Sequence, residues 1–265
     1  MEAFFRWTAW EVKGLKPYDA FHIAFFVFAI IVISRLTDRL KNCSEETSNR
    51  VLFGSGVFLF VFEIYKQLFY YYVMSPDQYD WSILPFQICS TPMYLLLLLP
   101  LVKGRAFERV IYNYIYVFGT FGGLATYLQP SGMIHDHIML TLHSFIWHLV
   151  LMFVGIHILK SRSRELTAFN DARRLFLLFA VFALTINVVV ERQFGAYINM
   201  FFLGPQRSTV FGLSALYDKI GWLGPLIVIV VGVPLAVGAA SHQLLVVYNR
   251  RHPVSESEDE VFVEL

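Results

Sequence analysis

Residues 51–73 read VLFGSGVFLFVFEIYKQLFYYYV, a stretch that is long and apolar enough to cross a membrane yet carries two charged side chains near its middle. A transmembrane helix needs about 20 mostly apolar residues. Six further stretches meet that requirement, each bounded by charged residues, by proline or by both: 20–36, 84–102, 110–128, 138–159, 174–191 and 221–247. The chain is therefore predicted to be all-α, a polytopic transmembrane helix bundle of about seven spans.

Composition supports a protein whose surface faces lipid. Hydrophobic residues make up 57% of the chain and charged residues 15%, whereas a soluble domain carries about 25% charged residues. The net charge of +1 gives no reason to expect nucleic acid, so membrane lipids are the expected partners, and the oligomeric state stays open. Cys43 lies in a polar stretch and Cys89 in an apolar one, which predicts that they are not bridged. No metal-ligand spacing or cofactor motif is present, and no metal or cofactor is expected.

Basic residues predict the topology. Lys and Arg are concentrated in the first, third and fifth loops and after the last span, while the second and fourth loops have none. By the positive-inside rule the N-terminus is expected outside and the C-terminus in the cytoplasm, which places the protein in the cell membrane. The predicted parts are an N-terminal interfacial segment (1–19) without a cleavable signal, the helix bundle (20–247) and a cytoplasmic acidic tail (248–265). The three cations of the interfacial segment run against the rule.

Polar side chains inside spans are costly and tend to face the interior of a bundle. Glu63 and Lys66 are three residues apart in the second span, so they share a helix face, and Gln67 continues it. This pair could position a polar substrate or support a catalytic group, or it could be a structural ion pair between helices. The spacing alone leaves both interpretations open.

The third span begins LPFQICSTPMYL at residue 84. Pro85 is expected to start the helix and Pro92 to interrupt it. On that helix Gln87 and Thr91 would share a face, with Cys89 about half a turn away. A polar stretch interrupted by proline is a plausible site, because its unpaired backbone groups need protein or water partners. Cys89 alone could equally be a small core residue.

The fifth span carries His143 and His148, which are five residues apart and so lie on different faces. They are not expected to line one narrow site together, and His148 is the favoured candidate for an acid or base. In the sixth span Asn187 and Glu191 share a face. The long sixth loop (192–220) is apolar enough to fold back over the outer mouth as a re-entrant or interfacial lid.

Gly119 and Gly123 in the fourth span have the GxxxG spacing. This spacing predicts close packing against another helix rather than chemistry.

The order of these features resembles the YwaF-type bacterial integral membrane proteins. The stretch Pro85–Cys89 is similar to that family's Pro-x-His-x-Cys-like opening of the third span, and FIWHLVLMFVGIHIL, which contains His148, is similar to its histidine segment. Glu63, Lys66 and the Asn199-Met200 segment also have counterparts there. The resemblance extends to eukaryotic membrane acyltransferases that remodel ether phospholipids, and more remotely to androgen-induced-gene-type lipid hydrolases. Alignment on Pro85 leaves Cys89 three residues beyond the eukaryotic nucleophile.

What the resemblance implies is a lipid-acting protein, either a Cys/His-dependent acyltransferase or a lipid hydrolase, in which Cys89 attacks an acyl ester and His148 takes the thiol proton. Gln87 or Thr91 would then hydrogen-bond the developing oxyanion. The further substrate-binding or supporting residues are Glu63, Lys66, Asn187 and Asn199. Two other classes stay open: a transporter or permease for a small amphipathic solute, and a non-catalytic subunit of a membrane complex.

Overall fold

The computed structural model describes residues 1–76, 78–166, 169–205 and 212–253. Over these residues the chain is helical and contains no β-strand, apart from an isolated antiparallel bridge between Glu11 and His137. The all-α prediction is confirmed. The two cysteines are not joined to each other. The last twelve residues, most of the predicted acidic tail, lie outside the described part.

Five helical runs in the described residues are long and apolar enough to cross a membrane. Two of them contain a π-helical segment, which is the wider turn that often marks a site of irregular packing. They are α2 (Ala20–Leu40), α3 (Glu45–Phe69) with the π-helix Tyr70–Met74, α7 (Ile138–Arg162), α8 (Phe169–Phe194), and α10 (Leu223–Ile227) continued through the π-helix Val228–Gly232 into α11 (Val233–Arg251). They coincide with five of the seven predicted spans.

The predicted span 84–102 is only half helical. The helix α4 (Thr91–Leu98) begins with Pro92 among its first residues and ends in a 3-10 turn, Leu99–Leu101. Pro92 therefore starts the helix instead of interrupting it, because proline fits the first turn, where no backbone N–H is needed. Residues 84–90 form turns and bends, so the prediction of a helix starting at Pro85 was wrong.

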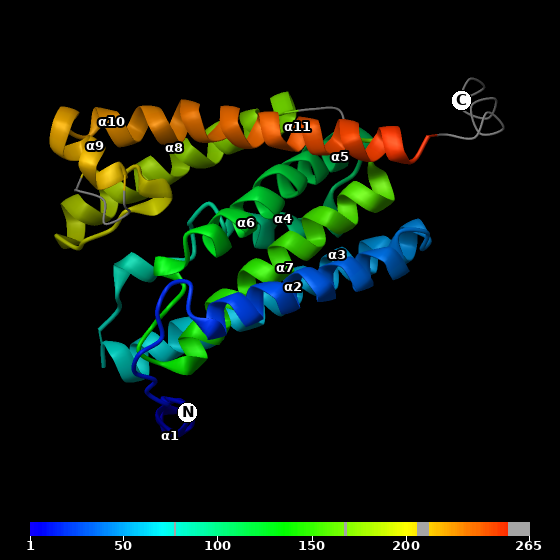
Figure 1. Cartoon of the computed structure of the whole chain (residues 1–265). Helices are drawn as coiled ribbons and strands as arrows, with labels where there is room; N and C mark the ends of the chain where they lie inside the picture. Colours follow the sequence, from blue (N-terminus) through cyan, green and yellow to red (C-terminus); the bar gives the residue numbers. More distant parts are fainter. Residues whose placement is uncertain (77, 167–168, 206–211, 254–265) are drawn as a thin grey trace.

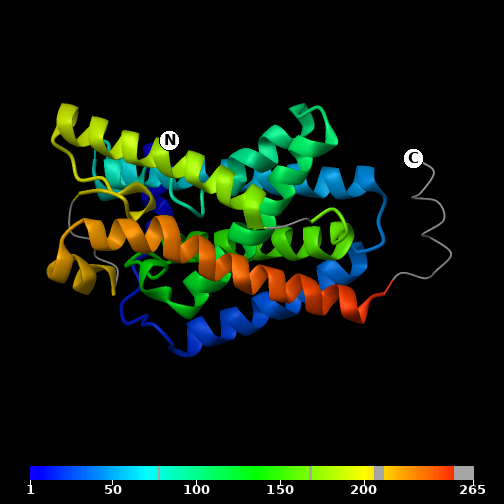
Figure 2. The same cartoon turned by 90° about the horizontal axis from the view of Figure 1, so that it is seen from above.

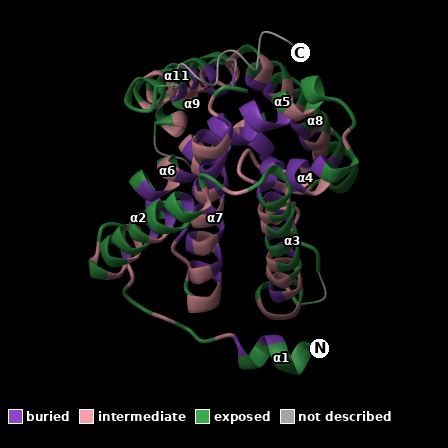
Figure 3. Ribbon diagram, turned by 90° about the vertical axis from the view of Figure 1, so that its right-hand side faces the viewer, coloured by how far each residue is buried: buried purple, intermediate pink, exposed green. Residues whose placement is uncertain are grey.

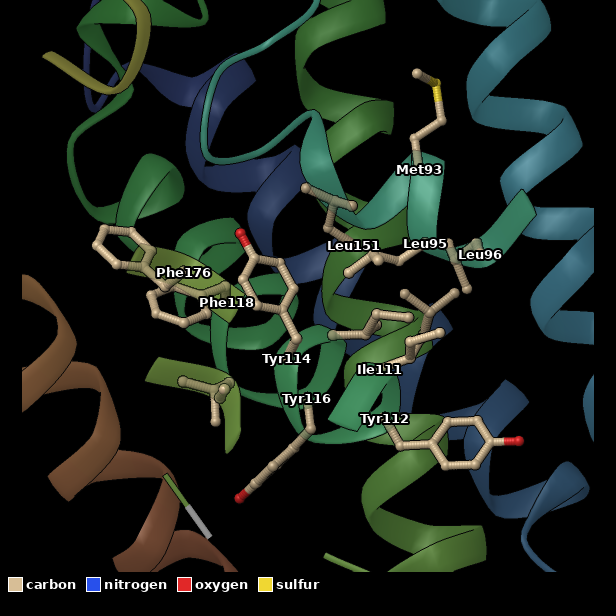
Figure 4. Close-up of a cluster of buried hydrophobic side chains, with 14 of the residues drawn as sticks. Met93, Leu95, Leu96, Ile111, Tyr112, Tyr114, Tyr116, Phe118, Leu151 and Phe176 are labelled. Atoms are coloured by element: carbon tan, nitrogen blue, oxygen red, sulfur yellow. The ribbon is translucent and has the colours of Figure 1, made fainter. Parts of the chain in front are cut away.

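The predicted span 110–128 lies within a longer helical run. α5 (Arg105–Tyr114), the π-helix Ile115–Gly119 and α6 (Thr120–Leu128) follow one another without a break. Many of their side chains are buried, including three tyrosines shown with their neighbours in Figure 4: Tyr112, Tyr114 and Tyr116. This run is less apolar than the five above, and the total of seven spans remains a prediction.

Buried residues gather at the centre of the bundle and apolar residues also cover its outside. Viewed along the helices, purple buried segments of α4 and α7 occupy the middle, while α2, α3 and α11 turn green faces outward (Figure 3). The outward side chains of α2 include Val27, Phe28 and Ile31, which are each about half exposed. Exposed apolar faces on long helices are what a bilayer solvates.

The helix α7 organises the packing. It contacts α2, α3 and α6, while α8 contacts α5 and α11. Figure 1 and Figure 2 show α8 and α11 side by side over the rest of the bundle, with α1 and the last turn of α11 toward opposite ends.

The N-terminal segment lies against the beginning of α7. In α1 (Glu2–Trp7) the ring of Phe5 is buried against Tyr65 and Tyr72 of the second span. Further on, the backbone N–H of Val12 donates to the carbonyl of Asp136 at 2.8 Å. These contacts place the segment at the same end as the loops that were predicted to lie outside.

Candidate functional site

A cavity of about 220 Å³ lies between the second span, the unwound segment 84–90 and α7. Its walls combine charged, amide, thiol, hydroxyl and imidazole side chains with apolar ones. The lining residues are Glu63, Lys66, Tyr70, Ser82, Ile83, Leu84, Gln87, Cys89, Ser90, Gly132, His135, His143, Ser144, Trp147 and His148. Five of the residues selected from the sequence therefore meet in one place: Cys89, His148, Glu63, Lys66 and Gln87.

Cys89 sits on irregular backbone inside the bundle, one residue before the N-cap of α4. Carbonyl groups freed by the unwinding need donors, because a buried peptide group without a partner is costly. Side chains supply them: the carbonyls of Ile83, Pro85, Ile88 and Cys89 accept from Gln67 Nε2 (2.8 Å), Tyr94 Oη (2.7 Å), Thr91 Oγ1 (2.8 Å) and Trp147 Nε1 (3.1 Å). The bond from Trp147 ties the backbone of Cys89 directly to α7.

His148 presents a nitrogen that the protein leaves unused. Its Nδ1 lies 2.7 Å from the carbonyl oxygen of Ser144, and a carbonyl only accepts, so Nδ1 carries the proton in this arrangement. In the neutral ring Nε2 is then the acceptor. That atom is buried and has no hydrogen-bond partner among the described residues. A neutral histidine fixed by its other nitrogen, with a free lone pair in the cavity that Cys89 also lines, has the form of a general base, although no hydrogen bond joins its Nε2 to the thiol in the described residues.

His143 lines the same cavity, contrary to the expectation from its spacing. Its ring is stacked between Phe62, at 4.6 Å between centroids, and Trp147, at 5.5 Å. Its Nε2 is also buried without a partner among the described residues. Five residues correspond to an arc of about 140° around a helix, and the cavity borders that whole arc, since Ser144 and Trp147 line it as well.

Glu63 and Lys66 form the ion pair that their spacing suggested. Lys66 Nζ lies 2.8 Å from Glu63 Oε1, and Gln67 Nε2 donates to the same oxygen at 2.6 Å. The Glu63 side chain is 5% exposed and that of Lys66 21%. Two donors on one carboxylate compensate for its loss of water, and Lys66 is the partner that can reach a ligand.

His135, in the loop before α7, also lines the cavity. Its Nε2 is 3.2 Å from the hydroxyl of Ser144, and Thr141 Oγ1 donates to its backbone carbonyl at 3.1 Å while accepting from its N–H at 3.0 Å. Burial lowers the pKa of His135, and the nearby Lys66 cation lowers it further. Sequence reasoning did not select His135, His143 or Ser144, although the spacing of 143, 144, 147 and 148 marks one broad helix face.

Three amide side chains hold an irregular inner segment, residues 199–204, which we call the clasped segment. Gln87 accepts from the N–H of Phe201 at 2.9 Å and donates to the carbonyl of Asn199 at 3.1 Å. Asn187 accepts from the N–H of Met200 at 2.7 Å and donates to its carbonyl at 3.0 Å. The Asn199 side chain accepts from the N–H of Gly204 at 2.8 Å.

The clasped segment carries unusual backbone. Phe201 and Phe202 have φ of 56° and 57°, values that residues other than glycine rarely adopt. Met200 and Phe201 are fully buried, so part of the predicted lid (192–220) runs inside the protein. Residues 206–211 of that loop lie outside the described part.

The remaining selected residues do not line the cavity. Asn187 and Asn199 serve the clasped segment, and Thr91 bonds the carbonyl of Ile88 and lies 2.6 Å from the hydroxyl of Tyr114. Gln87 lines the cavity but spends its oxygen and one N–H on the clasped segment, so one N–H of its amide is left over.

The glycine pair fixes how closely the fourth helical run approaches α7. A Cβ added to Gly123 would come within 2.9 Å of the carbonyl oxygen of His148 and 2.6 Å of the Met152 side chain. A Cβ on Gly119 would come within 3.2 Å of the Leu151 carbonyl. The predicted close packing is confirmed, and it lies directly behind the cavity histidine.

Comparison with known proteins identifies the family. The family model of the TMEM164 family matches residues 16–243. The chain belongs to the TMEM164 family. That match covers the cavity and the clasped segment in full, and together with the apolar helices it establishes a multi-pass membrane protein. No curated protein and no solved structure matches the chain.

Proposed function

We propose that this TMEM164 family member transfers acyl chains between phospholipids in the cell membrane, with Cys89 as nucleophile and His148 as general base. The observation that supports this is the meeting of the two in one cavity, where His148 holds its proton on Nδ1 and leaves Nε2 without a partner. The likeness of the segments around Cys89 and His148 to those of membrane acyltransferases points the same way.

In the first half-reaction the thiol proton of Cys89 passes to His148 Nε2 and the sulfur attacks the carbonyl carbon of an acyl ester. The tetrahedral intermediate collapses by breaking the bond between that carbon and the glycerol oxygen. His148 returns the proton to that oxygen, which releases a lysophospholipid and leaves a thioester on Cys89. Transfer of the thiol proton to a nearby base is required because a thiol in apolar surroundings does not ionise by itself.

In the second half-reaction the hydroxyl of an acceptor lysophospholipid gives its proton to His148 and attacks the thioester carbon. The carbon–sulfur bond breaks and the thiolate regains the proton from His148. If water is the acceptor, the same steps give a fatty acid and the protein is a hydrolase. Donors for the oxyanion in both steps are the unused N–H of Gln87 and the Lys66 ammonium, which both line the cavity.

The cavity volume fits a particular part of the substrate. About 220 Å³ holds roughly seven waters at ~30 Å³ each, enough for a glycerol ester linkage and a small headgroup. The acyl chains would stay in the surrounding hydrocarbon. The ion pair with Glu63 keeps the Lys66 ammonium, the proposed oxyanion donor, in place.

The thioester is the species to look for. Purified protein in nanodiscs of a phosphatidylcholine with isotope-labelled acyl chains should gain the mass of one labelled chain, which neutral hydroxylamine removes. The adduct should be absent in Cys89→Ala and present in Cys43→Ala, the matched control at the other cysteine. An adduct that persists in Cys89→Ala would exclude this mechanism.

A further inference from the structure

A second cavity lies at the basic end of the bundle, where α2, α7 and α11 end. It also has a volume of about 220 Å³ and shares no residue with the cavity around Cys89. Its lining residues are Asp38, Lys41, Lys160, Leu244, Val247, Tyr248, Arg251 and His252. Figure 1 shows the three helix ends together on the side of the C-terminus.

The charges around this cavity are unbalanced. Lys160 Nζ bonds Asp38 Oδ1 at 2.7 Å, and the Lys160 side chain is 18% exposed. Lys41 and Arg251 have no ion-pair partner within residues 1–76, 78–166, 169–205 and 212–253. Asp38 forms an ion pair with one of the three cations, Lys160, so among the described residues the cavity keeps an excess of positive charge and donors that remain open.

One wall of the cavity is well fixed. Tyr248 donates to the carbonyl of Lys160 at 3.3 Å, which joins α11 to the end of α7. His252 stacks on the Tyr248 ring at 4.4 Å between centroids, and its Nδ1 lies 3.0 Å from the Tyr248 carbonyl. These contacts fix the chain on both sides of Arg251, which also lines the cavity.

The other wall is apolar and continues along the lipid-facing surface. Leu244 and Val247 line the cavity itself. On α2, Ile31 and Val27 lie seven and eleven residues before Asp38 and so share its helix face, and both are about half exposed. Cations in the last turn of a helix also compensate its dipole, but that role needs no apolar wall. A phosphate joined to acyl chains would contact both the cations and the apolar wall.

We infer that this cavity binds the phosphate of an anionic glycerophospholipid from the leaflet at the basic end of the bundle. The phosphate oxygens accept from Lys41, Lys160 and Arg251, and the chains lie along α2 and α11. Basic pockets between transmembrane helices on the cytoplasmic side favour such headgroups, and each nearby Lys or Arg contributes about 1 kcal/mol. The site is separate from the proposed catalysis, and either can hold without the other.

The test compares two pairs of substitutions that remove equal charge from the same two helix ends. Lys41→Gln/Arg251→Gln removes cations that line the cavity, while Arg39→Gln/Arg250→Gln removes neighbours that do not. Full-length protein is titrated with phosphatidylglycerol in phosphatidylcholine nanodiscs, and bound lipid is counted by native mass spectrometry. The first pair should weaken phosphatidylglycerol binding by about tenfold or more, and the second by less than about twofold.

Two further arms identify the ligand. Val247→Glu places a carboxylate in the apolar wall and should weaken binding as much as the first pair while all exposed cations remain. Glycerol 3-phosphate at millimolar concentration should not displace the lipid, because it lacks chains. Equal losses in the two charge pairs, or displacement by glycerol 3-phosphate, would overturn the inference.

Discussion

The cavity and the clasped segment are built from similar polar side chains, but they treat them in opposite ways. In the clasped segment both polar atoms of Asn187 are bonded to backbone groups. In the cavity His143 and His148 each keep a buried nitrogen without a partner among the described residues. Buried polar atoms are normally satisfied, so the two regions differ: the clasped segment uses its polar groups to bond backbone, and the cavity leaves two imidazole nitrogens available to a ligand.

This contrast sorts the residues that sequence reasoning had placed in one group. Substitution in the clasped segment should lower the free energy of unfolding and leave the chemistry of the folded fraction intact. Substitution at unpartnered cavity atoms should lower the activity of the folded fraction and leave the free energy of unfolding nearly unchanged.

Two histidines of α7 give the sharpest comparison. His148→Ala should lower acyl transfer by about a thousandfold, because general-base catalysis contributes roughly 10²–10⁴. His157→Ala should leave the rate within about twofold, because His157 does not line the cavity and its Nε2 lies 2.9 Å from the hydroxyl of Ser48. Initial rates per folded protein, with the folded fraction measured by size-exclusion chromatography, decide the matter. Similar losses in both variants would mean that neither histidine acts as the base.

Substitution of only one partner of the Glu63–Lys66 ion pair should lower the free energy of unfolding strongly. Lys66→Met leaves the Glu63 carboxylate buried with Gln67 as its remaining donor, which should destabilise the protein by about 3–5 kcal/mol. The double variant Lys66→Met/Glu63→Gln should recover much of that free energy, because no uncompensated charge is left. Unfolding in mixed micelles measures both. A double variant as unstable as the single one would mean that the pair does not function as a coupled unit.

Asn187→Ala tests the clasped segment. It leaves the N–H and the carbonyl of Met200 without their partner in a fully buried place, and we expect a loss of about 2–3 kcal/mol. Thr185→Ala is the control, because its hydroxyl only bonds the carbonyl of Val181 within the same helix and should change stability by less than about 0.5 kcal/mol. Specific activity of the folded protein should be unchanged in both, and loss of activity at full stability would place Asn187 in the chemistry.

Much of the architecture follows from local sequence, but the shape of the site does not. Hydropathy located the five membrane-length helices, and spacing located the Glu63–Lys66 contact and the glycine packing. The unwound segment was missed because Pro85 and Pro92 are equally good helix starts when read locally. What favours the second is a set of side-chain donors: Gln67 and Trp147, which are further away in the chain, donate to the carbonyls of Ile83 and Cys89, and Tyr94 of α4 itself donates to that of Pro85.

The paired histidines were missed for a related reason. Spacing fixes the angle between His143 and His148 on α7, but the width of the cavity depends on where the unwound segment passes. The role of the amides in the clasped segment could not be predicted from local sequence either. Nothing in the sequence around Asn187 or Gln87 shows whether the amide bonds to backbone or binds a ligand.

Gly123 links the packing behind the site to the site itself, and its substitution should have the smallest effect of the series. Gly123→Ala places a methyl group 2.9 Å from the His148 carbonyl oxygen and 2.6 Å from Met152, and the flexible methionine can give way more easily than the backbone can. We expect a loss of about 1–2 kcal/mol and a several-fold slower transfer, because α7 must shift and carry His148 with it. Gly122→Ala is the matched control, since its added methyl meets no heavy atom within 4 Å. If the two variants unfold and react alike, the close approach of the fourth helical run to α7 does not position the base, and the cavity must be held by the contacts on its other side, the Trp147 bond to Cys89 among them.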